Sequence, residues 1–435
     1  MSFRSVLSMF QRLKMGGSAW AIVDQAVTSG GNFATVLFLA RGLPPAEFGT
    51  FALLNSILLV VLGFHANLIV SPLVVLAAPA SAAKFRTYTT SALGLTVALL
   101  PLSALAIFLA SASLHREVTG LLAILYIFAW QLQETTRRSL TSKLRYRDAV
   151  WGDAISYLGQ ALLVGLLFMH PRSTLNEAFA IMTATSLAAV ALQCWQGRLV
   201  SVAWERLREA GVSFWHLGKW LAVSGVMGVA LGPIYPWLMS WFHGRESAAA
   251  FQAVLNVLSL ANPIILSIQA IVVPAAANFL LTQDRRTGKS VLWMAMKYVV
   301  QLELIIAPLF LILAIWPHSA LALFYGKSSI YCNQTTALRV AVVASLILIP
   351  QTVLLAALTG VGKTKRNTVV IGAGTAAALV SAPPLIYAGG VVGGMVAMAI
   401  SRTACVLLAI RLLRTPAVKD SIGPMCAAPE TNVGL

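Results

Sequence analysis

Charged residues are scarce in this chain of 435 residues, since 10% are Asp, Glu, Lys or Arg whereas 58% are hydrophobic. The mean hydropathy of +0.82 is well above that of soluble domains. Acidic residues are the scarcest, with 14 against 31 basic residues and a formal net charge of +17. A nucleic-acid partner would need a basic soluble segment, but the charges fall between apolar runs. The composition therefore predicts an integral membrane protein and excludes a soluble enzyme.

Catalytic and metal-binding patterns are missing as well. The four cysteines (Cys194, Cys332, Cys405 and Cys426) lack disulfide or zinc spacing. No Ser/His/Asp set and no dinucleotide fingerprint occurs in a soluble segment. The stretch GVGKT at 360–364 has Ala357 where a phosphate-binding loop needs glycine, and an apolar run precedes it. We expect no cofactor, no metal and no enzymatic activity.

A cleavable secretory signal is also absent from residues 1–17, which have neither a short apolar core nor a small-residue cleavage site. Apolar residues from Phe3 to Leu13 recur there at helical spacing between basic residues. This pattern predicts a retained amphipathic helix on the cytoplasmic surface of the membrane.

Long apolar runs fill the rest of the chain. Crossing about 30 Å of hydrocarbon at about 1.5 Å per residue takes roughly 20 residues. On this basis we predict twelve membrane-spanning helices, near 18–41, 46–77, 87–111, 118–138, 149–169, 177–197, 219–242, 247–281, 290–315, 335–359, 368–387 and 391–411. The second and eighth spans are over-long, so kinks are expected at Pro72 and at Pro263 or Pro274.

The basic residues predict the orientation of these spans. The loops on one side contain only Arg41, Arg116, Arg172, Arg245 and Lys327, and the other side holds most of the remainder. By the positive-inside rule, both termini are cytoplasmic. Residues 198–218 form the longest cytoplasmic connection, so we predict an N-terminal bundle (18–197), an interlobe linker (198–218), a C-terminal bundle (219–411) and a cytoplasmic tail (412–435). A weak echo between 51–55 and 251–256 suggests that the halves are repeats in one orientation.

The segment LARGLPPAEFGTFALL at 39–54 resembles the polysaccharide transporters of the multidrug/oligosaccharidyl-lipid/polysaccharide exporter superfamily, which include O-antigen and exopolysaccharide repeat-unit flippases. The similarity in residues covers Leu39 to Leu54 only. A purely structural turn is an alternative reading, because Gly42, Pro44 and Pro45 would end one helix and stiffen the connection. The resemblance implies two six-helix bundles around a central V-shaped cavity. It also implies cargo in the form of an oligosaccharide on a polyprenyl diphosphate.

Polar residues interrupt the first span in the stretch WAIVDQAVTSGGNF (20–33). At about 100° per residue, Asp24, Gln25, Thr28, Ser29 and Asn32 share about 140° of the helix surface. A charged residue at a span centre costs about 2.5–3.5 kcal/mol on insertion, so this face is expected to meet protein or water. Either Asp24, Gln25 and Asn32 line a transport cavity, or the stripe holds the bundle together by hydrogen bonds. Asp24 is a candidate ion-coupling residue, and so is Glu303 in the ninth span.

Arg402 lies near the middle of the last span. A guanidinium does not lose its charge, so it needs an anionic partner. Glu303, similarly deep in the ninth span, is one such partner, and the cargo diphosphate is the other. The two pairings could alternate during transport.

Other embedded charges are open to two interpretations. Lys297 and Arg339 could guide the cargo phosphate, or their long side chains could snorkel to the membrane surface. Asp153 and Glu134 lie near the densest predicted cytoplasmic cluster of basic residues (Arg137, Arg138, Lys143, Arg145 and Arg147), where local ion pairing is the simpler explanation. His65 could titrate during transport, but a buried structural histidine is more common.

Taken together, these features predict a flippase for a polyprenyl-diphosphate-linked repeat unit in a bacterial inner membrane. Its partners would be the lipid-linked oligosaccharide and, from the resemblance, the polymerase and glycosyltransferases of the same pathway. One alternative is a drug or cation antiporter of the same superfamily, which Asp24 favours and Arg402 does not. A membrane polysaccharide polymerase is a more distant alternative, because no large outside loop is available to hold a glycan.

Overall fold

The computed structural model describes residues 17–170, 173–198, 207–229, 231–282, 291–362 and 364–414, and every regular element in these ranges is a helix. The N-terminal part comprises α2 (Gly17–Gly42), α3 (Pro45–His65), α4 (Ser71–Ala77), α5 (Ala82–Ser113), α6 (Glu117–Ser142), α7 (Tyr146–Asp153), α8 (Gln160–Leu167) and α9 (Leu175–Gly197). Two π-helical segments complete it: η1 (Ala66–Val70) joins α3 to α4, and η2 (Ala154–Gly159) joins α7 to α8.

The C-terminal part comprises α10 (Leu207–Val229), α11 (Leu231–His243), α12 (Arg245–Leu258), α13 (Asn262–Thr282), α14 (Val291–Ile315), α15 (Pro317–Tyr325), α16 (Thr335–Gly360) and α17 (Thr364–Arg414). Two short 3₁₀ segments, η4 (Ser259–Ala261) and η5 (Ile330–Asn333), lie between them. The predicted amphipathic helix lies outside the described residues except for Gly17, and the tail does so beyond Arg414. Residues 207–218 of the predicted linker form the first half of α10.

Both over-long spans depart from α-helical geometry near the prolines that predicted a kink. Segment η1 ends just before Ser71 and Pro72, where proline cannot supply the N–H for the carbonyl four residues earlier. In the other span, the 3₁₀ turn η4 lies just before Pro263, whereas Pro274 remains inside α13. The irregularity therefore occurs at Pro263.

Element α17 is two antiparallel helices that meet at Gly390. This residue has φ 53° and ψ −127°, a conformation that side-chain-bearing residues rarely adopt. Across the pair, Ser401 donates to the Gly374 carbonyl at 2.8 Å, and Arg366 donates to the Leu412 carbonyl at 3.1 Å. The spans predicted at 368–387 and 391–411 are accordingly separate helices.

Eight helical stretches of the described residues are long and apolar enough to cross a membrane, and one of them is the double-backed stretch Lys365–Arg414. The others are Pro45–Ala77, Ala82–Ser113, Tyr146–Leu167, Leu175–Gly197, Arg245–Ile265, Val291–Ile315 and Thr335–Gly360. Helices α2, α6 and α10 overlap predicted spans but do not meet the same criterion. In α2 and α6 the cause is polar residues, which the structure buries against neighbouring helices.

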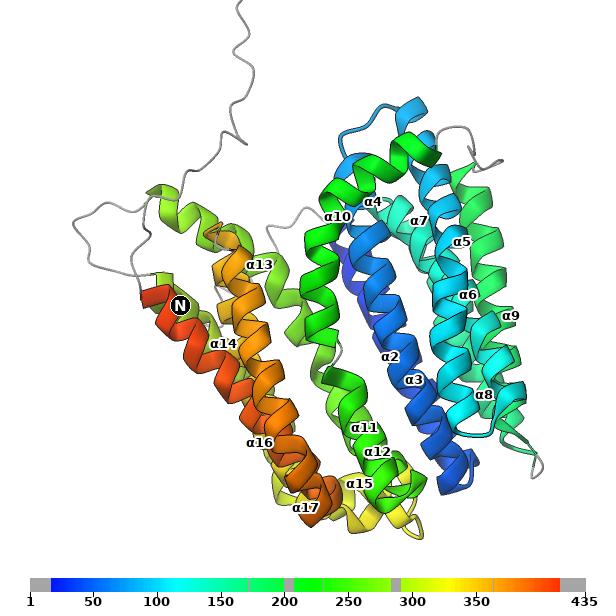
Figure 1. Cartoon of the computed structure of the whole chain (residues 1–435), viewed down its shortest axis with the longest axis vertical. Coiled ribbons are helices and arrows are strands. Elements are labelled where there is room, and N and C mark those ends of the chain that lie inside the picture. The colour runs from blue at the N-terminus through cyan, green and yellow to red at the C-terminus, as the bar shows by residue number, and fades with distance from the viewer. Residues whose placement is uncertain are drawn as a thin grey trace, which may run out of the picture.

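The helices form two groups that meet at one end (Figure 1). One group contains α2 to α9, and the other contains α11 to α17. Helix α10 runs beside the first group, against η1, α3 and α5, and also contacts α17. Toward the upper end of Figure 1, α16 and α17 diverge from α2 and α3.

Close contacts join the groups at the lower end of Figure 1, where the loops predicted to be outside lie. Arg41, at the end of α2, donates to the carbonyls of Leu323, at 2.8 Å, and Phe324 in α15. Trp237 of α11 donates to Ser56 of α3 at 3.2 Å. Gly49 of α3 faces the backbone of Arg245 at the start of α12, where a Cβ would come within 2.0 Å of the carbonyl oxygen. The two groups are therefore in contact at this end of the molecule.

We predict that Gly49→Ala destabilises this contact between the groups. The added methyl group must push α3 away from rigid backbone in α12, and overpacking of this kind costs about 1–3 kcal/mol. Thermal unfolding of the purified protein in detergent measures the effect. Gly30→Ala in α2 is the matched control, because a Cβ there has no atom within 4 Å. Equal melting temperatures for the two variants would contradict the close contact between α3 and α12.

Candidate functional site

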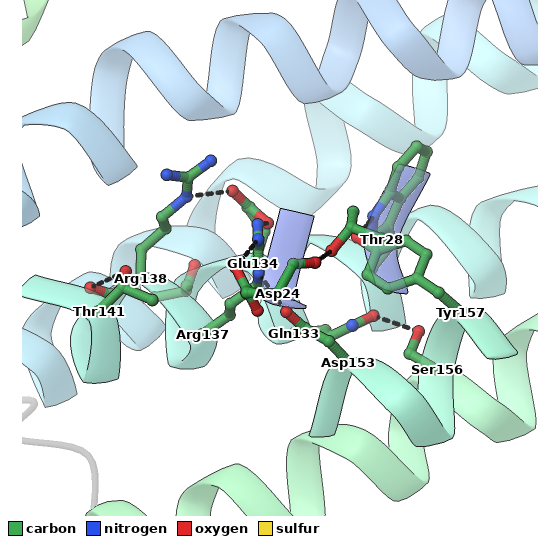
Figure 2. A network of polar contacts seen from close by, with 12 residues as sticks. Asp24, Thr28, Gln133, Glu134, Arg137, Arg138, Thr141, Asp153, Ser156 and Tyr157 are labelled. Atoms are coloured by element: carbon green, nitrogen blue, oxygen red, sulfur yellow. Dashed lines mark hydrogen bonds and ion pairs between the residues drawn. The ribbon is translucent and has the colours of Figure 1, made fainter. Parts of the chain in front are cut away.

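A buried ionic cluster links α2, α6 and α7 (Figure 2). Its centre is the guanidinium of Arg137 on α6, which contacts two carboxylates from different helices. Nε lies 2.5 Å from Oδ2 of Asp153, and a terminal nitrogen lies 2.6 Å from Oδ2 of Asp24. One cation thus bridges the carboxylates of α2 and α7.

Water has little access to these three side chains. Asp24 is 4% exposed, Arg137 6% and Asp153 0%. Taking a single charge out of water costs several kcal/mol, so each charge depends on its partners for compensation. The cluster can therefore persist only as a unit.

Glu134 and Arg138 extend the cluster toward the surface of the bundle. Glu134 lies 3.3 Å from Arg137 and 2.6 Å from Arg138, whose side chain is 45% exposed. The ionised cluster contains three carboxylates and two guanidinium groups, so it has an excess of one negative charge. Uptake of one proton or one monovalent cation would neutralise it.

Amide and hydroxyl groups surround the carboxylate of α7. Gln193 of α9 donates to Oδ1 of Asp153 at 3.4 Å and accepts from Thr136 at 2.7 Å. Oδ1 of Asp24, by contrast, is buried with no hydrogen-bond partner among the described residues. This oxygen is an acceptor that a proton or cation could use. The π-helical segment η2 begins directly after Asp153, and such segments recur at functional sites.

Asp24 therefore lies inside the N-terminal group, against α6 and α7, where it forms an ion pair. The polar stripe of α2 divides at this point, because Gln25 instead donates to Ser29 on its own helix at 2.9 Å. Asn32 is half-buried and has no hydrogen bond to a described residue. Next to it, the carbonyl of Phe33 accepts a bond from Asn256 of α12 at 3.4 Å. Asn32 is thus close to the contact between the two groups.

Arg137 is not among the site residues that the sequence predicts. It belongs to the cluster of basic residues that predicts the topology, although it also falls within the predicted span 118–138. Its position three residues after Glu134, on one face of the helix, was the available signal. The local ion pairs expected for Asp153 and Glu134 are present, with Arg137 as their partner.

Arg402 occupies the interior of the C-terminal group. It is half-buried on the second helix of α17 and donates to the carbonyl of Ala344 in α16 at 2.7 Å. The electrostatic neighbour of its guanidinium is Tyr235 of α11. No carboxylate pairs with Arg402 within the described residues. Most of its N–H groups thus remain available for an anion.

The expected pair between Arg402 and Glu303 is not formed. Glu303 is half-buried on α14 and has neither an ion pair nor a hydrogen bond to a described residue. Although both residues lie deep in their helices, α14 packs chiefly on α16 and has little contact with α17. The sequence predicts how far along its helix each of these residues lies, but it does not predict toward which neighbouring helix the side chain points.

Lys297 and Arg339 do not converge on one site. Lys297 is exposed near the start of α14 and lies over the ring of Trp293 at 5.9 Å. Arg339 is exposed on α16 and donates to the Ala314 carbonyl at the end of α14, at 3.1 Å. Residues 297 and 314 are about 25 Å apart along a helix that rises 1.5 Å per residue. A single phosphate cannot contact both cations.

His65 is fully buried between α3, α5 and α6. Its Nε2 lies 3.0 Å from the hydroxyl of Thr96 and 3.1 Å from that of Thr135. These bonds tie three helices together. This geometry supports the structural interpretation of His65.

Comparisons with known proteins establish the fold. No family model matches the chain, and no curated protein matches it. Among solved structures, an inward-facing multidrug resistance MATE transporter of the MOP superfamily has a TM-score of 0.73 at 14% identity, with 90% of this chain and 94% of that chain covered. The lipid II flippase MurJ in an inward closed conformation has a TM-score of 0.70 at 13% identity, with 93% and 88% covered.

A MOP superfamily transporter from Pyrococcus furiosus is also similar, with a TM-score of 0.65 at 13% identity and with 91% of this chain and 93% of that chain covered. The chain is therefore a multi-pass membrane protein with the transporter fold that MATE and MurJ share.

We predict that Arg137→Ala is strongly destabilising, by about 3–5 kcal/mol, because it leaves buried carboxylates without a cation. Arg138→Ala is the matched control and should cost about 1 kcal/mol or less, since that arginine is largely solvated. Thermal unfolding in detergent measures both. Adding Asp24→Asn and Asp153→Asn to Arg137→Ala should restore part of the lost stability, because the buried carboxylates are then replaced by neutral amides. Equal melting temperatures for Arg137→Ala and Arg138→Ala would contradict the conclusion that Arg137, Asp24 and Asp153 form one interdependent buried cluster.

Proposed function

We propose that this protein is a flippase that moves a polyprenyl-diphosphate-linked oligosaccharide across the membrane by alternating access between its two helix groups. In this proposal it has twelve spans, with both termini on the cytoplasmic side of a bacterial inner membrane. The fold shared with MurJ and with MATE transporters supports the transport class. The close contacts at one end of the groups support an inward-facing state.

The observation that carries this proposal is the environment of Arg402. Its guanidinium is embedded in the C-terminal group, is held by a backbone carbonyl, and has no carboxylate partner within the described residues. A permanent cation at this depth is costly unless an anion neutralises it at some stage of the cycle. Bidentate hydrogen bonds to a diphosphate would meet this need.

The state of Asp24 supports an anionic cargo over a cationic one. A carboxylate that receives an amphipathic cation must face the cargo with its charge uncompensated. Asp24 instead pairs with Arg137 inside the N-terminal group. The carboxylate that favoured an antiporter in the sequence is therefore engaged elsewhere.

A drug or cation antiporter remains the second candidate, and two observations favour it. MATE multidrug transporters are among the structures with the same fold. Glu303 is half-buried without a partner among the described residues, so it could receive a cation.

In this proposal the buried cluster couples transport to an ion gradient. Its excess negative charge, and the unpartnered Oδ1 of Asp24, suit one proton or one monovalent cation. Binding of that ion would weaken the hold of Arg137 on α2 and α7. The helices that the cluster joins could then shift relative to α6. The polymerase and glycosyltransferases of the same pathway are the partners proposed for the flippase.

We predict that Arg402→Gln reduces flipping about 10- to 100-fold, as expected for the loss of charge-assisted hydrogen bonds worth about 1.5–3 kcal/mol. The assay uses proteoliposomes of the full chain with a fluorescent prenyl-diphosphate-linked saccharide, and an impermeant reductant quenches the outer leaflet. Arg339→Gln is the matched control and should change the rate by less than about twofold, because Arg339 only caps the end of α14.

Normal flipping by Arg402→Gln would remove that residue from the mechanism. The same proteoliposomes, tested with a fluorescent amphipathic cation, separate the two candidate functions. Transport of the cation without transport of the prenyl diphosphate would contradict the flippase proposal and favour the antiporter.

We predict that Asp24→Asn abolishes the stimulation of flipping by an imposed proton or sodium gradient, because the cluster then has no excess charge to neutralise. Flipping rates with and without each gradient, in the same proteoliposomes, measure this stimulation. Glu117→Gln, which changes an exposed carboxylate at the start of α6, is the control and should leave it unchanged. An unchanged response in Asp24→Asn would exclude the cluster as the coupling site.

A further inference from the structure

A hollow of about 1180 Å³ lies at the end of the N-terminal group opposite the close contacts. Its walls come from the start of α5, the turn before α7, α7 itself and the end of α9, at the upper ends of these helices in Figure 1. Arg86, Arg145, Arg147 and Arg198 line it together with Trp151 and Trp195. None of these residues belongs to the ionic cluster or to the surroundings of Arg402.

The hollow has a strong excess of positive charge. Only one carboxylate lines it, that of Asp148, and Arg145 lies 2.6 Å from it. Arg145 also donates to the carbonyl of Gln196 at 3.1 Å, which fixes the turn before α7 against the end of α9. The side chains of Arg86, Arg147 and Arg198 have no partner among the described residues. Three guanidinium groups therefore line the hollow without an ion pair to any described residue.

The position of the hollow suits a lipid headgroup. Three of the stretches able to cross a membrane, Ala82–Ser113, Tyr146–Leu167 and Leu175–Gly197, end beside it. Trp151 and Trp195 are 55% and 77% exposed, and tryptophan gathers at the level of lipid headgroups. The arginines thus lie at the ends of helices able to cross a membrane, the region where lipid phosphates are expected.

A side chain that lines the same hollow has a hydrogen-bond acceptor without a partner in the described part of the chain. Oε1 of Gln196 is buried and has no hydrogen-bond partner among the described residues. Because water does not reach this oxygen in the present geometry, a ligand hydroxyl would bond to it only after the Gln196 side chain turns toward the hollow.

We propose that this hollow binds the headgroup of an anionic phospholipid, with the phosphate ester between Arg86, Arg147 and Arg198 and a headgroup hydroxyl near Gln196. Phosphatidylglycerol has both groups. Arginine suits this role because its planar fork binds two phosphate oxygens at once. Basic pockets between the ends of membrane helices recognise anionic lipids through the same chemistry. The bound lipid joins α5, α7 and α9 at the membrane surface.

Native mass spectrometry of the full chain in detergent, titrated with phosphatidylglycerol, tests the proposal. We expect Arg147→Gln to weaken binding of the tightest lipid about 5-fold, and Arg86→Gln/Arg147→Gln/Arg198→Gln about 100-fold, at about 1 kcal/mol per arginine. Lys84→Gln is the matched control, because Lys84 is an exposed cation on α5 that lines a separate, smaller hollow. It should change binding by less than about twofold. An unchanged melting temperature shows that each variant is folded.

Further ligands distinguish the source of the phosphate. Phosphatidylcholine, whose headgroup is neutral overall and lacks a hydroxyl, should not compete. Competition by inorganic phosphate or diphosphate at similar concentrations would assign the hollow to a soluble anion and overturn the lipid proposal. Equal weakening by Lys84→Gln and Arg147→Gln would reduce the effect to general surface charge and would also overturn it. Binding of phosphatidylglycerol that the triple variant retains would do the same.

Discussion

One guanidinium shared by two carboxylates in a space with almost no water is the constraint on which the N-terminal group depends. Arg137 can be buried only because Asp24 and Asp153 reach it from α2 and α7. These carboxylates tolerate their own burial only because Arg137 is there. The three helices are therefore fixed in rotation as well as in position. Gln193 donates a hydrogen bond to Asp153. Glu134 forms ion pairs with both Arg137 and Arg138, so the cluster extends to the surface of the bundle.

The two groups of helices differ in how their embedded charges are compensated. The N-terminal group gathers opposite charges into one cluster, which retains an excess of one negative charge. The C-terminal group holds Arg402 with a carbonyl and no carboxylate among its described residues. In the proposed function, one group would respond to a coupling ion and the other would hold an anionic cargo. The fold itself serves both MATE transporters and MurJ, so side chains such as these decide the cargo.

Basic residues at the membrane surface have a second role in this interpretation. The positive-inside pattern requires only that arginines lie on one side of the membrane. In the hollow between α5, α7 and α9, three of them also surround a common space beside two exposed tryptophans. Topology and lipid recognition can therefore depend on the same side chains. Arg339, by contrast, lies outside this hollow and donates to the Ala314 carbonyl at the end of α14.

The sequence by itself determined the helical membrane class, the separate helices on either side of Gly390 and the irregularity near Pro72, and it limited the second irregularity to Pro263 or Pro274. It did so because these depend on hydropathy along the chain and on the backbone restrictions of proline and glycine. It also identified Asp24 and Arg402 as embedded charges, since depth in a span can be counted. Only the tertiary structure decided that Asp24 meets Arg137, that Glu303 does not meet Arg402, and that Lys297 and Arg339 lie apart. Partners depend on helix rotation and on neighbours that lie from 25 to 113 residues away along the chain, and hydropathy along one chain contains no record of either.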